Sequence, residues 1–180
     1  VRSIDKIMNQ GIDITDKNEW THFRSIDVGN SKDSPLAVLF VALSKHRDRI
    51  ICYDELYKYE QSPTQICKTI VKESYNLPYK KTYYDPEALW LKQELEKEYA
   101  ITCTRGRKDC EQGILAVQRW LLKSGFDELP AVIILDNCEN LVREMQVYTI
   151  DEKKNDHLID ALRYYIYTEL EEPDEYRELY

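Results

Sequence analysis

The sequence predicts a single α/β domain built on a mixed β-sheet that is flanked by helices. Three strand-like runs follow one another near the start of the chain, which indicates a three-strand antiparallel meander. Further along, helical patterns alternate with short apolar runs, as expected for parallel strands joined by helical crossovers. A length of 180 residues suits one domain, and 43% hydrophobic with 32% charged residues argues against global disorder.

The three strands of the meander differ in character. Residues 23–28 (FRSIDV) form a short strand that ends at a turn-rich segment. Residues 36–43 (LAVLFVAL) are continuously apolar, which predicts a central strand buried on both faces. Residues 49–56 are rich in Ile and Tyr and form the third strand.

The elements after the meander alternate between helix and strand. Ser62 is a suitable N-cap, and Pro63 suits the first helical position because its missing N–H is not needed there. We then expect a strand at 81–84, a helix from an Asp85 cap to about residue 99, a strand at 100–104, a helix at 109–123, a strand at 131–135, a short helix at 137–145, an extended segment at 147–150 and a last helix at 156–170.

Several common chemistries lack their motifs in this sequence. There is no G-x-x-x-x-G-K-[ST] or G-x-G-x-x-G phosphate-binding loop, and no G-x-S-x-G elbow of a serine hydrolase. The five cysteines include no C-x-x-C pair, so we expect reduced thiols rather than a zinc site.

The net charge of −8 is unevenly distributed. Residues 169–180 hold six acids and one arginine, so the C-terminal end carries most of the excess. The acidic balance is therefore a weak argument against a nucleic-acid partner. We interpret residues 171–180 as an acidic tail and residues 1–21 as a linker.

Acidic residues occupy three positions where a metal site could form. Asp27 lies inside an apolar strand, where an ionised carboxylate is costly unless a cation compensates it. Asp85 follows the end of a strand, and Asp156, His157 and Asp160 lie within one turn of the last helix. Simpler interpretations stay open: Asp85 and Asp156 as N-caps, Asp27 as a turn acid and His157 as a surface imidazole. Together the acids suit Mg²⁺ or Mn²⁺, which prefer oxygen ligands, and Mn²⁺ also accepts imidazole.

Six short motifs occur in one order along the chain. They are Asp27-Val28-Gly29, Tyr53-Asp54-Glu55-Leu56-Tyr57, Tyr84-Asp85-Pro86, Gly113-Ile114-x-x-Val117, Leu141-Val142-Arg143-Glu144-Met145-x-x-Tyr148 and the run DHLIDALRY at 156–164. In this order the chain resembles, over roughly residues 22–170, the C-terminal nuclease domain of the large terminase subunit of tailed bacteriophages. The run DHLIDALRY is the most specific part of the resemblance.

The resemblance implies an RNase H-like fold and metal-dependent cleavage of double-stranded DNA concatemers during genome packaging, with two Mg²⁺ or Mn²⁺ ions. It also implies an upstream ATPase domain, portal protein and small terminase subunit as partners, and action in the host cell cytoplasm. Residues 22–170 would then be the nuclease domain, and residues 1–21 the linker from the ATPase domain.

The resemblance also assigns roles to the acids. Asp27 would be the first metal ligand and Asp85 the second, and the third would come from the last helix. Asp160 is the first choice for that ligand and His157 the second, with Asp156 also possible. Many family members have two adjacent acids where this chain has Asp156-His157, which motivates the hypothesis of a Mn²⁺ preference.

Basic clusters offer a way to hold DNA. They comprise Lys80 and Lys81, then Arg105, Arg107 and Lys108, and finally Lys153 and Lys154. Two of these clusters flank proposed ligands, so we expect phosphate contacts beside the cut, although solvated loop charges are an equal alternative. No base-reading element is recognisable, which predicts little sequence specificity. The competing functions are another RNase H-like nuclease of the resolvase type and a non-catalytic docking module of a packaging motor.

Overall fold

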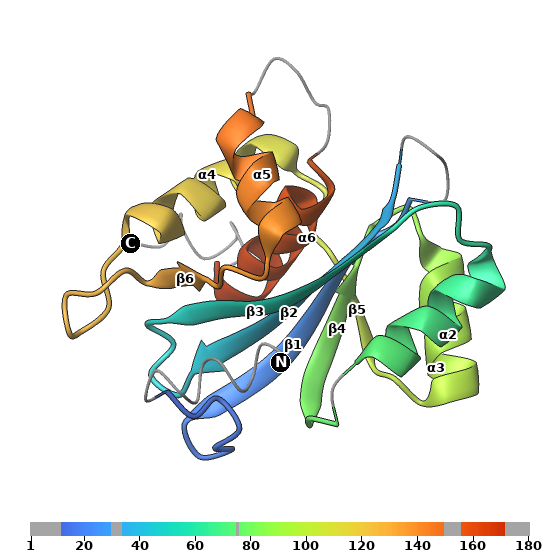
Figure 1. Ribbon diagram of the computed structural model, residues 1–180, viewed down its shortest axis with the longest axis horizontal. Helices are drawn as coiled ribbons and strands as arrows, with labels where there is room; N and C mark the ends of the chain where they lie inside the picture. The colour runs from blue at the N-terminus through green and yellow to red at the C-terminus, as the bar shows by residue number, and fades with distance from the viewer. Residues whose placement is uncertain (1–11, 30–33, 75, 150–155, 172–180) are drawn as a thin grey trace, which may run out of the picture.

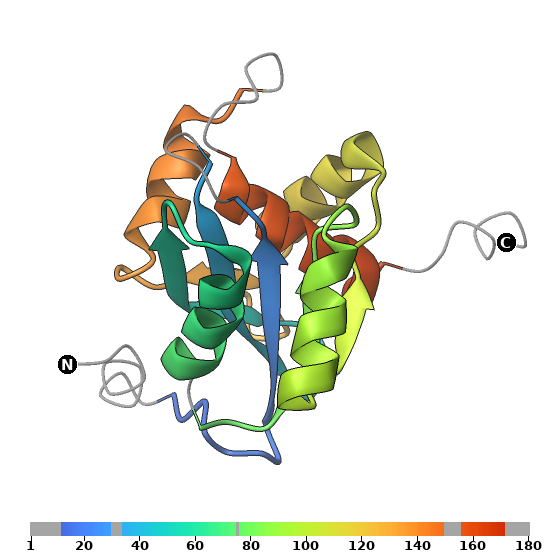
Figure 2. The same cartoon turned by 90° about the vertical axis from the view of Figure 1, so that its right-hand side faces the viewer.

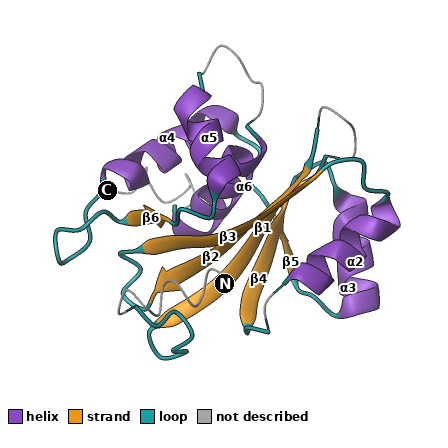
Figure 3. Ribbon diagram, in the orientation of Figure 1, coloured by secondary structure: helices purple, strands orange, loops and turns teal. Residues whose placement is uncertain are grey.

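Two layers of helices cover the two faces of one mixed β-sheet. The computed structural model describes residues 12–29, 34–74, 76–149 and 156–171. Helices α2 (Pro63–Glu73) and α3 (Leu89–Tyr99) pack on one face, and α4 (Cys110–Leu122), α5 (Glu139–Val147) and α6 (His157–Tyr165) pack on the other (Figures 1 and 3). A π-helical turn, η1 (Ile166–Leu170), continues α6. No described helix has the length and hydropathy needed to cross a bilayer.

The sheet combines an antiparallel meander with parallel strands, as predicted. Strands β1 (Trp20–Asp27), β2 (Leu36–Ser44) and β3 (Ile50–Lys58) form the meander. On one side β4 (Tyr79–Tyr84) and β5 (Cys103–Arg105) continue the sheet in parallel to β1, and on the other side β6 (Val132–Ile134) runs parallel to β3. The strand order is β5-β4-β1-β2-β3-β6.

Strand β2 is buried on both faces, which confirms the prediction from its apolar run. Because side chains alternate along a strand, Val38, Phe40 and Ala42 enter the core under α2 and α3. Leu39 and Val41 enter the core under α4, α5 and α6. The two helical layers are therefore joined through the same central strand.

Local capping follows the sequence signals at two helices. Ser62 forms a complete capping box with Gln65, so α2 begins at Pro63 as expected. Asp109 caps α4 by accepting the backbone N–H of Gln112 at 3.0 Å.

The predicted helix start at Asp85 is wrong. The Asp85 carboxylate accepts the backbone N–H of Glu87 at 2.8 Å, which closes a turn over residues 85–87, and α3 begins only at Leu89. Ala88, at φ −93° and ψ 50°, leaves the helical region and takes the N-cap position of α3, so Asp85 caps only the turn before it.

Several other boundaries differ from the prediction; the strand expected at 100–104, for example, is β5 at Cys103–Arg105. Strand β1 begins at Trp20 rather than at residue 23, because residues 20–22 already pair with residues 42–44 of β2. Helix α5 continues through Val147, which replaces the start of the expected extended segment.

Candidate active site

The first two predicted acids lie at the same edge of the sheet. Asp27 is the last residue of β1 and is only 8% exposed. Asp85 directly follows β4, the parallel neighbour of β1, and its backbone N–H donates to the carbonyl of Ile26 at 3.0 Å. The carboxyl ends of parallel strands meet at one edge, so sheet topology brings these distant residues together.

Helix α6 brings the third group of predicted residues to this edge. Alternation along β1 places Asp27 on the same face as Phe23, whose ring centroid lies 5.2 Å from that of Tyr165 on α6. Figure 2 shows α6 lying beside the end of β1. The first residue of α6 is His157, and its Nδ1 lies 2.8 Å from Oδ2 of Asp27. His157 is therefore a partner of Asp27 and not merely a surface imidazole.

Burial and neighbouring charges both act on the Asp27 carboxylate. Burial, together with the negative charges of Asp160 and Asp85, raises the pKa of Asp27 to about 6, although the hydrogen bond with His157 acts to lower it. The pKa of the Tyr164 hydroxyl is also raised, first by burial and then by the charges of Asp27, Asp160 and Asp85. The charges of Asp85 and Asp160 thus both influence Asp27 and Tyr164.

Asp160 is oriented by an arginine one turn further along α6. Its Oδ1 accepts a hydrogen bond from Nε of Arg163 at 2.9 Å, and the Arg163 side chain is almost fully buried. Asp156 occupies the N-cap position of α6, but its side chain makes no capping hydrogen bond. Asp156 contributes its carbonyl, which accepts the backbone N–H of Asp160 at 2.7 Å.

The cap of α6 comes instead from Glu144 of α5, a residue whose role the sequence did not reveal. Glu144 is fully buried, and its Oε2 accepts the backbone N–H groups of Leu158 at 2.7 Å and Ile159 at 3.1 Å. Its Oε1 accepts the hydroxyl of Tyr57 on β3 at 2.9 Å. One signal was present in the sequence: Glu144 lies three residues after Leu141. The two side chains therefore share one face of α5, and both are buried.

Burial of Glu144 predicts a pH-dependent stability. Desolvation raises its pKa from the usual 4.5 to about 7, so between these values the folded protein holds a proton that the unfolded chain has released. The contribution of Glu144 to the free energy of unfolding is complete below pH 4.5 and is lost as the pH rises through 7. At about 1.4 kcal/mol per pH unit, the loss is at most roughly 3 kcal/mol.

Glu144→Gln should therefore flatten the pH dependence of the free energy of unfolding between about pH 5 and 8. The glutamine amide can still accept from the first turn of α6, so its fold should be kept. Urea titrations of both proteins at each pH measure the difference. An equal slope for the variant and the parent protein would show that Glu144 does not titrate in this window.

Two predicted DNA-binding residues hold the loop after Asp85. Arg105 donates from Nε to the carbonyl of Pro86 at 3.0 Å, and Lys108 forms an ion pair with Glu87 at 2.6 Å. Arg105 ends β5 and Lys108 lies between β5 and α4, and both reach the residues that follow Asp85. The Arg105 contact ties the end of β5 to this loop, whereas the Lys108–Glu87 pair is largely exposed and contributes little to stability.

The other predicted DNA-binding residues are in different settings. The Arg107 guanidinium lies over the ring of Tyr167, 3.6 Å from its centroid, and Lys81 pairs with Glu169 at 3.0 Å. Lys80 is exposed. Lys153 and Lys154 lie outside the described residues.

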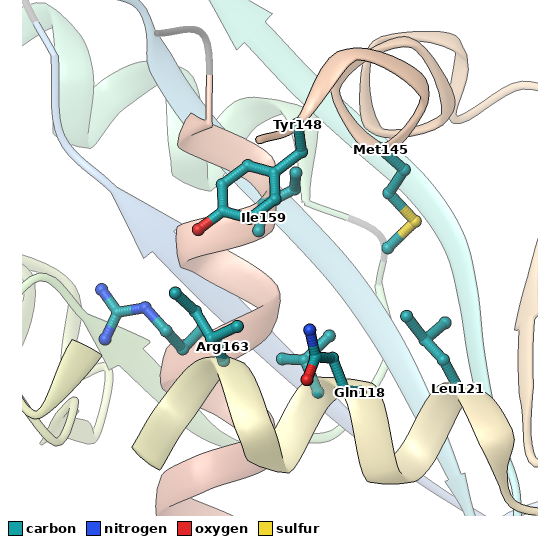
Figure 4. A pocket seen from close by; sticks show the side chains of 8 residues that line it. Gln118, Leu121, Met145, Tyr148, Ile159 and Arg163 are labelled. Carbon is teal, nitrogen blue, oxygen red and sulfur yellow. The ribbon is translucent and has the colours of Figure 1, made fainter. Parts of the chain in front are cut away.

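A separate hollow of about 200 Å³ lies between α4, α5 and α6 (Figure 4). It is lined by Ile114, Val117, Gln118, Leu121, Met145, Tyr148, Ile159 and Arg163. No acid is among these lining residues, so this hollow is distinct from the carboxylate site. Arg163 connects the two, because it lines the hollow while its Nε holds Asp160.

The donor set fits a hard divalent cation. The pKa of Asp27 is raised first by burial and then by the charges of Asp160 and Asp85, and a cation beside these carboxylates would stabilise their ionised forms. Within the described ranges, no three Asp, Glu, His or Cys side chains are already spaced to enclose an ion. Ion binding would therefore require these side chains to move closer together.

The chain is similar to solved structures of phage large terminases. It aligns over 86% of its length with 41% of the large terminase from a thermophilic bacteriophage, with a TM-score of 0.71 and 19% identity. It aligns over 82% of its length with 85% of the nuclease domain of g2p, the large terminase of bacteriophage SPP1 solved with bound Mn, with a TM-score of 0.62 and 25% identity. The match to the P22 large terminase nuclease domain covers 82% and 80% of the two chains, with a TM-score of 0.66 and 16% identity.

These likenesses confirm the RNase H-like fold and the resemblance to terminase nuclease domains expected from the sequence. The chain spans about two fifths of the thermophilic phage's large terminase but at least four fifths of the two separate nuclease domains. No protein-family model matches the chain, and no curated protein does.

Proposed function

We propose that this chain is the endonuclease domain of a phage DNA-packaging terminase large subunit, which cleaves double-stranded DNA concatemers with little sequence specificity. The convergence of Asp27, Asp85 and Asp160 at one edge of an RNase H-like sheet carries this proposal. The similarity to terminase nuclease domains supports it.

Asp27, Asp85 and either Asp160 or His157 would hold two Mg²⁺ or Mn²⁺ ions. The SPP1 nuclease domain solved with bound Mn supports a divalent metal at this type of site. Such ions, when bound, activate an attacking water and stabilise the leaving oxygen of a phosphodiester. Asp156 stays a further candidate for the third ligand.

The chain's own residues orient the groups that would face the metal and the substrate. Arg163 fixes the carboxylate of Asp160 through its Nε hydrogen bond. His157 presents Nδ1 to Asp27. Its other ring nitrogen, Nε2, is therefore the one that can take a proton from the attacking water. The contacts from Arg105 and Lys108 hold the loop that carries Asp85.

DNA would be gripped mainly by other parts of the packaging motor. Lys81, Arg107 and Lys108 already contact other groups of the domain, which leaves exposed Lys80, with Lys153 and Lys154, as the better candidates for phosphate contacts. An upstream ATPase domain would supply most of the affinity through effective concentration. Portal protein and the small terminase subunit are the other proposed partners, with the host cell cytoplasm as the location.

Metal-dependent nicking tests the proposed function. Purified protein should convert supercoiled plasmid to nicked and linear forms with Mg²⁺ or Mn²⁺, and excess EDTA should stop the reaction. Mn²⁺ should also raise the melting temperature, because it binds the folded state. Preferential cutting of four-way junctions would favour a resolvase. The absence of both nicking and a melting shift would favour a non-catalytic docking module.

A further inference from the structure

We infer that Glu144 is a positioning residue of the nuclease reaction, which places the first turn of α6 and thereby His157 and Asp160. This inference rests on the proposed function. The residue lies on α5, outside the set of acids at the ends of β1 and β4. Its contacts run to the backbone of α6 rather than to a metal or substrate.

The first turn of a helix needs an external hydrogen-bond acceptor, because its leading N–H groups have no partner within the helix. Most helices take that acceptor from their own N-cap side chain. In α6 the N-cap side chain of Asp156 makes no such bond, and the carboxylate of Glu144 accepts from Leu158 and Ile159 instead. The position of the turn is thus set by a neighbouring helix.

Glu144 is itself held in place. Its second oxygen accepts the Tyr57 hydroxyl from β3, and the side chain is fully buried. A buried carboxylate with three defined donors has little freedom to move, since each lost hydrogen bond would leave a buried polar group unsatisfied. The sheet, α5 and α6 are therefore connected through one side chain.

The connection matters for chemistry because His157 is the first residue of α6 and immediately precedes Leu158. A shift of the first turn moves His157 away from Asp27, whose Oδ2 lies 2.8 Å from its ring nitrogen. Asp160 lies on the same turn and would move with it. Misplacement by about 1 Å is enough to cost roughly 100-fold in rate when a catalytic constellation is preorganised.

The variants Glu144→Ala, Glu144→Gln and Tyr57→Phe test this inference. Glu144→Ala removes all three hydrogen bonds and should lower plasmid nicking and Mn²⁺ affinity by about 10- to 100-fold. Glu144→Gln keeps an acceptor for α6, so it should stay within about threefold of the parent protein. Tyr57→Phe removes only the anchor and should fall between the two. Ser62→Ala removes a cap on α2, on the opposite face of the sheet, and serves as the matched control.

Hydrogen exchange gives a readout that does not depend on activity. In Glu144→Ala the amides of Leu158 and Ile159 should exchange faster, with the core strand β2 still protected. Loss of protection spread evenly over the domain would overturn the inference, as would Glu144→Ala nicking like Ser62→Ala at equal folded fraction.

If the parent protein itself neither binds Mn²⁺ nor nicks DNA, the proposed function fails, and the exchange pattern alone decides whether Glu144 places α6. If Tyr57→Phe is the only folded variant, unchanged activity in it overturns the inference.

Discussion

Asp27→Asn is expected to lower metal-dependent plasmid nicking by more than about 100-fold, because it replaces the first of the proposed metal ligands. The fold should be kept. Asparagine has the same size as aspartate. Its side-chain amide can either donate a hydrogen bond to the His157 ring or accept one from it. It also removes a buried negative charge beside Asp85 and Asp160, so the melting temperature should not fall.

Nicking rates in Mn²⁺ and melting temperatures of the two proteins measure this pair of effects. Asp109→Asn is the matched control, since Asp109 is an exposed N-cap of α4 and asparagine caps a helix as well as aspartate does. Near-normal nicking by folded Asp27→Asn would contradict the assignment of the active site.

Leu162→Ala is expected to destabilise the protein by about 2–5 kcal/mol, because it leaves a cavity where α6 packs on the sheet. Leu162 is fully buried in the core that α6 shares with β1 and β2. The free energy of unfolding from urea titration measures the effect, and it would be among the largest for a single truncation.

Leu122→Ala makes the same chemical change at an exposed position. Leu122 is 87% exposed at the end of α4, so its truncation should change the free energy of unfolding by less than about 0.5 kcal/mol. Equal losses in the two variants would show that α6 is not anchored through Leu162.

The elements that the sequence predicted well are those whose signal is local. The apolar run at 36–43 predicts β2 without any information about the rest of the chain. The Ser62 capping box sets the start of α2 through contacts within a few residues. The convergence of Asp27 and Asp85 was also accessible, because it follows from two parallel strands ending at the same edge. The roles of the individual ligands and the domain boundaries stay predictions.

The features that the sequence did not predict depend on tertiary contacts. Asp85 has the local signature of a helix cap, yet the loop that follows it is held by Arg105 and Lys108 from another part of the chain. Their predicted contacts with DNA stay a prediction, because charge alone does not reveal a partner. Glu144 could not be identified as the cap of α6 because the groups that donate to it lie on separate elements.

The location of bound Mn²⁺ tests the central claim most directly. Crystals soaked in Mn²⁺ should give anomalous density between the carboxylates of Asp27 and Asp85, within ligand distance of Asp160 or His157 on α6. Crystals of Asp27→Asn treated in the same way should lose it. Anomalous density elsewhere on the domain, or none in crystals of a protein that still nicks DNA in Mn²⁺, would contradict the assignment.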